Sequence, residues 1–216
     1  MRYSTLFFDL DDTLYPADSG LWQVLKERIS LYMHEKLGLT WQEIPSLRRH
    51  LYQTYGTSLR GLKALYEIDE LDYLVFVHDV PLHHFIHPIP YLRETIQSYP
   101  QRKFIFTNAD HNHARRVIKT LELEGCFEKI IDIHTIAPYC KPMTPAYQIA
   151  MQEADETDPR KCVLIDDSVA NLTEARRLGF FTIRVGEDET PGEYDASLNV
   201  LSEIHRVLPS NRSELS

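Results

Sequence analysis

The second half of the chain alternates short apolar segments with segments of helical periodicity, and this alternation restricts the fold more than any other feature. The apolar segments are continuous and rich in Ile, Val and Phe, as in strands buried on both faces: 103–108, 129–135, 161–167 and 180–186. Helical patterns near 112–124, 145–154 and 169–178 separate them. Strands that alternate with helices predict a parallel sheet covered by helices on both sides.

A further apolar segment, residues 2–10, predicts one more strand of the same sheet. The segment after it lacks strand patterns, and its apolar residues follow helical spacing, with Leu21, Leu25 and Ile29 on one face. Other helices are expected at 41–55, 57–67 and 70–79. We therefore expect an α/β fold: a Rossmann-like core, residues 1–16 and 86–216, with an inserted all-helical cap, residues 17–85. The polar tail, residues 210–216, is expected to be frayed.

Composition excludes several classes of protein. With 216 residues, 43% of them hydrophobic, the chain can bury a substantial core. Its formal net charge of -9 disfavours a nucleic acid polymer as partner, because such binding depends on neutralising phosphates with Lys and Arg. The three cysteines form no CxxC pair, which argues against a disulfide framework or a structural zinc site. The apolar segments are too short to span a membrane, and we expect a cytoplasmic monomer or homodimer that acts on a small molecule.

Polar residues follow three of the expected strands at their carboxyl ends, where parallel sheets bind ligands. A lysine, Lys141, stands in the loop before the helical pattern at 145–154. The residues at the strand ends are Asp9, Asp11 and Thr13, then Thr107 and Asn108, then Asp166 and Asp167. One edge of the sheet is thus expected to gather carboxylates, a hydroxyl, an amide and an ammonium group.

These residues form four motifs in a fixed order. They are Asp9-Leu10-Asp11-Asp12-Thr13 (DxDxT), then Thr107, then Lys141, then the pair Asp166-Asp167. The set resembles the haloacid dehalogenase superfamily of phosphohydrolases, and the helical insertion looks like that family's cap domain. The resemblance covers nearly the whole chain and implies a Mg²⁺-dependent hydrolase of phosphomonoesters.

The chemistry of the residues agrees with this resemblance. A carboxylate in line with phosphorus can displace the leaving group, and Asp9 is the candidate nucleophile. Asp11 returns to the same side of the extended chain two residues later and is the candidate general acid and base. Crowded carboxylates need a hard cation, which we expect to be Mg²⁺ held by Asp9, the backbone carbonyl of Asp11 and Asp167. We expect Asp166 to support the site, although the sequence does not rank Asp166 against Asp167 as a direct ligand.

The phosphoryl oxygens are expected to bind Thr107, the backbone N–H of Asn108 and Lys141. Simpler structural roles remain open for the neighbouring residues. Capping of the helix that follows is the alternative role for Asn108, Asn171 is expected to brace Asp167, and His113 is expected to lie on a helix face.

The cap is expected to choose the substrate. Its segment YQTYGTSLRGLKALY, residues 52–66, looks like the pyrimidine 5'-nucleotidase branch of the superfamily, whose cap covers a nucleoside monophosphate. Arg60 is the candidate reader of a base edge or phosphate, and Tyr52 or Tyr55 is the candidate for stacking on a flat ring. The alternatives are a broad phosphatase of sugar phosphates, a phosphotransferase with the same motifs, a non-catalytic member and a haloacid dehalogenase.

Overall fold

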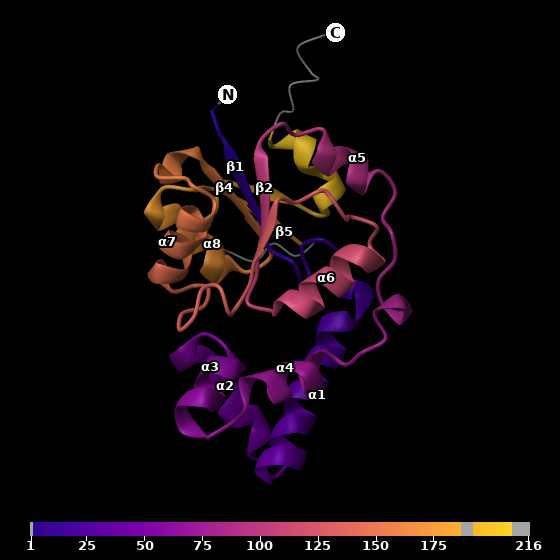
Figure 1. Ribbon diagram of the computed structural model, residues 1–216, viewed down its shortest axis with the longest axis vertical. Helices are drawn as coiled ribbons and strands as arrows, with labels where there is room; N and C mark the ends of the chain where they lie inside the picture. The colour runs from indigo at the N-terminus through magenta and orange to yellow at the C-terminus, as the bar shows by residue number, and fades with distance from the viewer. Residues whose placement is uncertain (1, 187–191, 209–216) are drawn as a thin grey trace. The chain divides into compact units, whose positions relative to one another are not determined.

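The computed structural model describes residues 2–186 and 192–208, so the polar tail lies outside the described residues. The chain divides into two compact units. One contains the described residues up to Ser19 and from Ile86 onward, and the other is Gly20–Phe85. The first is the α/β core and the second is the all-helical cap (Figure 1).

The core is built on a six-stranded sheet with the order β3-β2-β1-β4-β5-β6, in which every neighbouring pair is parallel. The strands are β1 (Thr5–Phe8), β2 (Arg102–Phe106), β3 (Lys129–Ile131), β4 (Cys162–Asp166), β5 (Phe181–Val185) and β6 (Ala196–Leu198). The expected fold class is confirmed. The edge strand β6 was not expected, because three residues are too few to show a periodic pattern.

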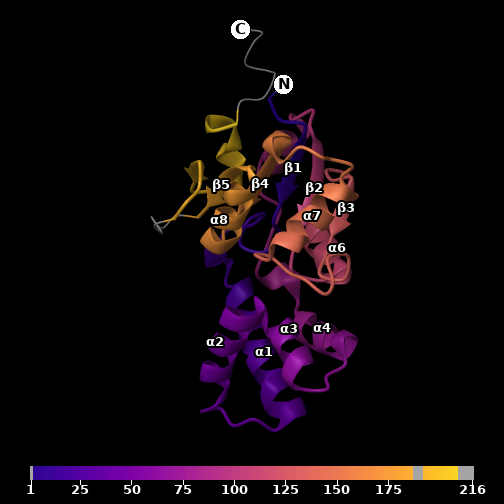
Figure 2. The ribbon, with the colours of Figure 1, turned by 90° about the vertical axis from the view of Figure 1, so that its left-hand side faces the viewer.

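Helices cover both faces of this sheet (Figures 1 and 2). Helices α7 (Thr144–Glu153) and α8 (Val169–Leu178) lie on one face, and α5 (Leu92–Gln97) and α6 (His111–Thr120) lie on the other. Short 3₁₀ segments occupy Ala17–Ser19, Leu82–His84, Pro159–Lys161 and Leu201–Arg206. Because both faces are covered, the strands are buried and read as continuous apolar runs.

The order of the strands determines where a site can form. The chain runs from β1 outward to β2 and β3, and then returns to place β4 on the other side of β1. The carboxyl ends of β1 and β4 therefore border the point where the direction of winding changes, which is where doubly wound sheets bind ligands. Asp9 follows β1 at this point, Thr107 follows β2, and Asp166 ends β4.

The cap consists of α1 (Leu21–Leu37), α2 (Ile44–Tyr55), α3 (Ser58–Leu65) and α4 (Glu70–His78). The rings of Tyr32 and Tyr73 meet edge to face at 5.0 Å between α1 and α4. Helices α2 and α3 approach closely at Gly61, where a Cβ atom would stand 2.5 Å from Leu51 Cδ2. A glycine is therefore required there by the packing of the two helices.

Among the described residues, no helix is both long enough and apolar enough to cross a membrane.

Candidate active site

The segment after β1 is shaped by backbone hydrogen bonds. The N–H of Asp9 donates to the carbonyl of Ile165 at 2.8 Å, which continues the pairing of β1 with β4. The N–H of Leu14 then donates to the carbonyl of Leu10 at 3.0 Å and closes a turn over residues 10–14, in which Asp12 has a positive φ of 58°. Within that turn Thr13 Oγ1 donates to Asp9 Oδ2 at 3.3 Å. The nucleophile candidate is thus held from the strand on one side and the turn on the other.

Lys141 connects the ends of two strands. Its Nζ lies 2.7 Å from Asp9 Oδ1 and 2.7 Å from Asp166 Oδ2, and its side chain is only 1% exposed. Burial opposes the charged ammonium group, but the carboxylates of Asp166 and Asp9 outweigh that effect and raise the pKa of Lys141. Lys141 therefore stays protonated and partly neutralises the two acids.

The loop that carries Lys141 is held by Asn108. The side-chain Nδ2 of Asn108 donates to the Lys141 carbonyl at 3.0 Å, and the Lys141 N–H donates to Asn108 Oδ1 at 2.8 Å. Asn108 does not cap the helix that follows; Asp110 does, by accepting from the N–H groups of Asn112 and His113. The amide of Asn108 thus places the ammonium group of Lys141.

The two members of the Asp166-Asp167 pair have different surroundings. Asp166 is fully buried and accepts hydrogen bonds from Lys141, from the N–H of Ser168 at 2.9 Å and from Asn171 Nδ2. The expectation that Asn171 braces Asp167 was wrong, because its amide donates to both oxygens of Asp166, at 3.0 and 3.1 Å. Asp167 is half-buried, and burial together with the charges of Asp166 and Asp9 raises its pKa.

Three carboxylates converge at this edge of the sheet. Oxygen atoms of Asp9, Asp166 and Asp167 lie within 4.8 Å of one another. Burial raises the pKa of Asp9, and the charges of Asp166 and Asp11 add to this effect against the opposing influence of Lys141. With one ammonium group beside three carboxyl groups, full ionisation would leave a net negative charge at the site. A set of anionic oxygen donors of this kind fits a hard divalent cation such as Mg²⁺.

Asp11 has two partners that were not predicted from the sequence. Tyr15 Oη donates to Asp11 Oδ1 at 2.6 Å, and His113 Nε2 lies 2.9 Å from the same oxygen. The turn between Asp11 and Tyr15 includes Asp12 with a positive φ of 58°, so helical spacing did not indicate their contact. His113 lies on helix α6, as expected. Its contact with Asp11, which is 102 residues away in the sequence, was not predicted.

The comparisons with known proteins agree with this geometry. The family model of the haloacid dehalogenase-like hydrolases matches residues 3–179. The chain belongs to this family.

Relatives of this haloacid dehalogenase-like hydrolase include phosphate metabolism protein 8 of Saccharomyces cerevisiae, which is 28% identical over 215 residues. That match covers 93% of the chain but spans only 66% of the length of the yeast protein. Among solved structures, YfnB from Bacillus subtilis, bound to magnesium, aligns with a TM-score of 0.67 at 18% identity over 97% of this chain and all of that one.

The L-2-haloacid dehalogenase from Xanthobacter autotrophicus, with chloropropionic acid covalently bound, has a similar fold too. Its TM-score is 0.60 at 15% identity, over 95% of this chain and 98% of that one. Structural likeness at this level of identity establishes the fold of the hydrolase and leaves its reaction to be argued from the site.

The candidate substrate residues of the hydrolase's cap contact other cap residues. Arg60 Nη1 lies 3.6 Å from Glu70 Oε1, and its N–H donates to Thr57 Oγ1 at 3.1 Å at the start of α3. The ring of Tyr55 borders Gly61, where an added Cβ would stand 3.0 Å from it. Both residues thus support the packing of the cap, and their roles in substrate binding stay predictions.

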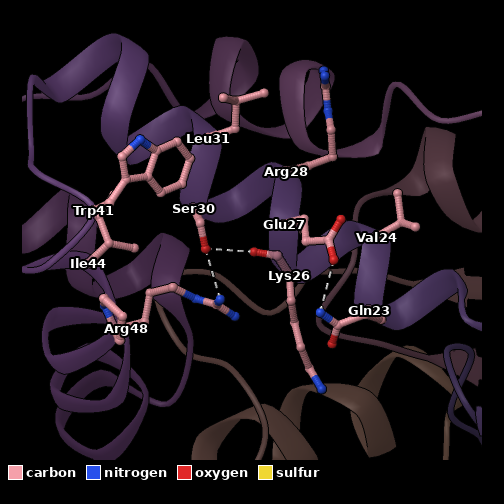
Figure 3. Close-up of a pocket in the computed structure, with 11 residues that line it drawn as sticks. Gln23, Val24, Lys26, Glu27, Arg28, Ser30, Leu31, Trp41, Ile44 and Arg48 are labelled. Atoms are coloured by element: carbon pink, nitrogen blue, oxygen red, sulfur yellow. Dashed lines mark hydrogen bonds between the residues drawn. The ribbon is translucent and has the colours of Figure 1, made fainter.

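The cap also contains a cavity of about 560 Å³ between α1 and α2 (Figure 3). Arg48 Nη1 donates to Ser30 Oγ at 3.0 Å beside it, and Ser30 Oγ donates to the Lys26 carbonyl at 2.9 Å. The indole of Trp41 borders the same cavity. Its lining does not include Arg60 or Tyr55.

Proposed function

We propose that this hydrolase is a phosphatase that cleaves phosphomonoesters through an aspartyl phosphate formed on Asp9. The observation that carries the proposal is the position of Lys141 Nζ, 2.7 Å from both Asp9 and Asp166. A buried ammonium group beside the nucleophile offsets the repulsion between a carboxylate and a phosphate dianion. Asp11, two residues after Asp9, supplies the carboxyl group that the leaving oxygen needs.

The reaction has two steps. In the first, an oxygen of Asp9 attacks phosphorus, the bond from phosphorus to the leaving oxygen breaks, and Asp11 gives that oxygen its proton. In the second, water attacks phosphorus, Asp11 takes a proton from the water, and the bond from phosphorus to Asp9 breaks. Inorganic phosphate leaves, and both acids return to their initial states.

The residues at the strand ends have separate supporting roles in this proposal. Thr107, the backbone N–H of Asn108 and Lys141 bind phosphoryl oxygens. Asp9, the backbone carbonyl of Asp11 and Asp167 would hold Mg²⁺, which when bound neutralises charge on the carboxylates and the phosphoryl group. Asp166 is occupied by Lys141, Ser168 and Asn171, which supports Asp167 as the direct ligand.

Other reactions of this fold need different residues. A dehalogenase uses the same nucleophile on carbon but needs neither a second acid at position 11 nor the Asp166-Asp167 pair, and this chain has both. A phosphotransferase passes the phosphoryl group to an acceptor other than water. Release of stoichiometric inorganic phosphate from 4-nitrophenyl phosphate, with Mg²⁺ and water as the sole acceptor, tests the proposal. Absence of phosphate release, or halide release from a 2-haloacid, would overturn it.

We further propose that the substrate is a pyrimidine nucleoside 5'-monophosphate such as UMP or CMP, with small sugar phosphates as the second candidate. The resemblance of residues 52–66 supports this, with Arg60 reading the base or phosphate and Tyr55 stacking on the ring. Small apolar differences discriminate weakly between ligands, so hydrogen bonds must supply much of the preference.

The preference is measured as kcat/KM for UMP, CMP, AMP, GMP and a set of sugar phosphates. We expect at least a 10-fold advantage for UMP or CMP, and we expect Arg60→Ala to reduce it by about 1–3 kcal/mol in transition-state stabilisation. Arg49→Ala, which removes an exposed arginine of α2, is the matched control. Equal kcat/KM values for all substrates would reject the pyrimidine assignment and leave the phosphatase assignment intact.

A further inference from the structure

We propose that Tyr15 and His113 are positioning residues for Asp11, which they hold by one oxygen so that the other oxygen carries the transferred proton. This inference rests on the proposed phosphatase activity. It assigns a role in the reaction to two residues that lie outside the four motifs.

Tyr15 reaches Asp11 through the turn that follows β1. The hydrogen bond from Leu14 N–H to the Leu10 carbonyl, 3.0 Å, closes a turn over residues 10–14, and Tyr15 directly follows this turn. Tyr15 is only 2% exposed, and its Oη donates to Asp11 Oδ1 at 2.6 Å. Burial, followed by the nearby charge of Asp11, raises the pKa of Tyr15, which keeps the phenol protonated and able to donate.

His113 reaches Asp11 from the start of α6, which is held from two sides. Asp110 caps the helix by accepting from the N–H groups of Asn112 and His113, at 2.8 and 3.1 Å. Asp132, just after β3, accepts from the N–H of His111 at 3.0 Å. These contacts fix the first turn of α6, and the side chain of His113 is completely buried with Nε2 2.9 Å from Asp11 Oδ1.

The chemistry of the shared oxygen explains why two donors are useful. A carboxylate oxygen has no proton to donate, so when Asp11 is ionised both Tyr15 Oη and His113 Nε2 donate to Oδ1. An oxygen that accepts two hydrogen bonds is the carbonyl oxygen when the acid is protonated and a carboxylate oxygen when it is not. Both bonds therefore persist in both states, and the proton moves on and off Oδ2 without reorientation of the carboxyl group.

This role predicts an effect that depends on the leaving group. A poor leaving group such as the alkoxide of an alkyl phosphate needs a proton from Asp11, whereas 4-nitrophenolate leaves with little help. The value of kcat/KM covers the steps through formation of the aspartyl phosphate, so it isolates this proton transfer from the later attack of water. We expect Tyr15→Phe and His113→Ala each to lower kcat/KM by at least about 10-fold for an alkyl phosphate and by less than about 3-fold for 4-nitrophenyl phosphate.

Two further variants separate positioning from a structural effect. His113→Gln retains a side-chain N–H donor and should recover part of the loss for the alkyl phosphate that His113→Ala suffers. In an Asp11→Asn background, His113→Ala should cause almost no additional loss, because its effect is transmitted through Asp11. His111→Ala removes an exposed histidine two residues earlier in α6 and should leave both rates unchanged.

The outcomes distinguish this inference from the proposed function. If the wild-type protein hydrolyses neither ester, the phosphatase proposal fails and the inference fails with it. Suppose instead that the wild type is active. The positioning role is overturned if the variants lose the same factor in kcat/KM with both esters, or if His113→Ala lowers kcat/KM equally in the wild-type and Asp11→Asn backgrounds. The phosphatase proposal stands in both cases.

Discussion

The charged residues at the candidate site of the core and those around Glu70 in the cap differ in how their partners are distributed along the chain. In the core, Lys141 pairs with Asp9 across 132 residues and with Asp166 across 25, so residues from three separate segments meet at buried positions. In the cap, Arg60 and Lys63 both face Glu70, which lies within ten residues of each. The core thus concentrates charges that local structure alone would keep apart.

This difference has a physical reason. Burying charges is costly unless they are paired, and bringing distant segments together also costs conformational entropy. Burying Asp9, Asp166 and Lys141 together costs solvation free energy. It also holds these three side chains in a preorganised site. The pair of Lys63 with Glu70 in the cap needs no such explanation, because a local pair with a partly exposed lysine contributes little and costs little.

The largest effect is expected from substitution of Asp9, the candidate nucleophile. Asp9→Asn keeps the size of the side chain but removes the attacking carboxylate, and we expect the rate of phosphate release to fall by at least about 10,000-fold. Asp12→Asn is the matched control, because Asp12 has a positive φ of 58° that Asn also tolerates. Comparable rates of phosphate release for Asp9→Asn and the wild type would show that Asp9 is not the nucleophile.

A smaller effect is expected when one candidate metal ligand is removed. Removing divalent ions with EDTA should abolish phosphate release, and adding Mg²⁺ should restore it. For Asp167→Asn, we expect the Mg²⁺ concentration that gives half-maximal activity to rise at least about 10-fold, since one direct ligand is lost.

A readout independent of activity is the thermal midpoint of unfolding. Binding to the folded state alone raises Tm, so Mg²⁺ should raise the Tm of the wild type and have a weaker effect on Asp167→Asn. If Asp167→Asn leaves the half-maximal Mg²⁺ concentration unchanged, Asp166 and not Asp167 is the direct ligand.

The smallest expected effect concerns the cap. Gly61→Ala gains helix propensity of about 1 kcal/mol but places a methyl group 2.5 Å from Leu51 Cδ2, so we expect a net loss of about 1–3 kcal/mol in the free energy of unfolding. Urea unfolding gives this value. Leu51→Ala removes the opposing methyl groups, so the double variant should be less destabilised than the sum of the two single variants. A stabilising Gly61→Ala would show that α2 and α3 do not require this close approach.

The sequence alone determined five of the six described strands of the core sheet and the helices α6, α7 and α8. Continuous apolar runs indicated strands buried on both faces, and parallel strands gather their carboxyl ends at one edge. Asp9, Thr107 and Asp166 follow or end adjacent strands as expected. Their meeting could be anticipated because parallel strands end at the same edge of a sheet, and the alternation of strands and helices predicted parallel strands.

Only the tertiary structure decided which polar atoms meet. It directs Asn171 to Asp166 and not to Asp167, makes Asn108 the brace of Lys141, and brings His113 to Asp11 across 102 residues. It also shows that Gly61 serves the contact of α3 with α2. Periodicity indicates which face a side chain occupies, but the choice of partner on that face depends on the placement of every packed element around it, which no local stretch of sequence contains.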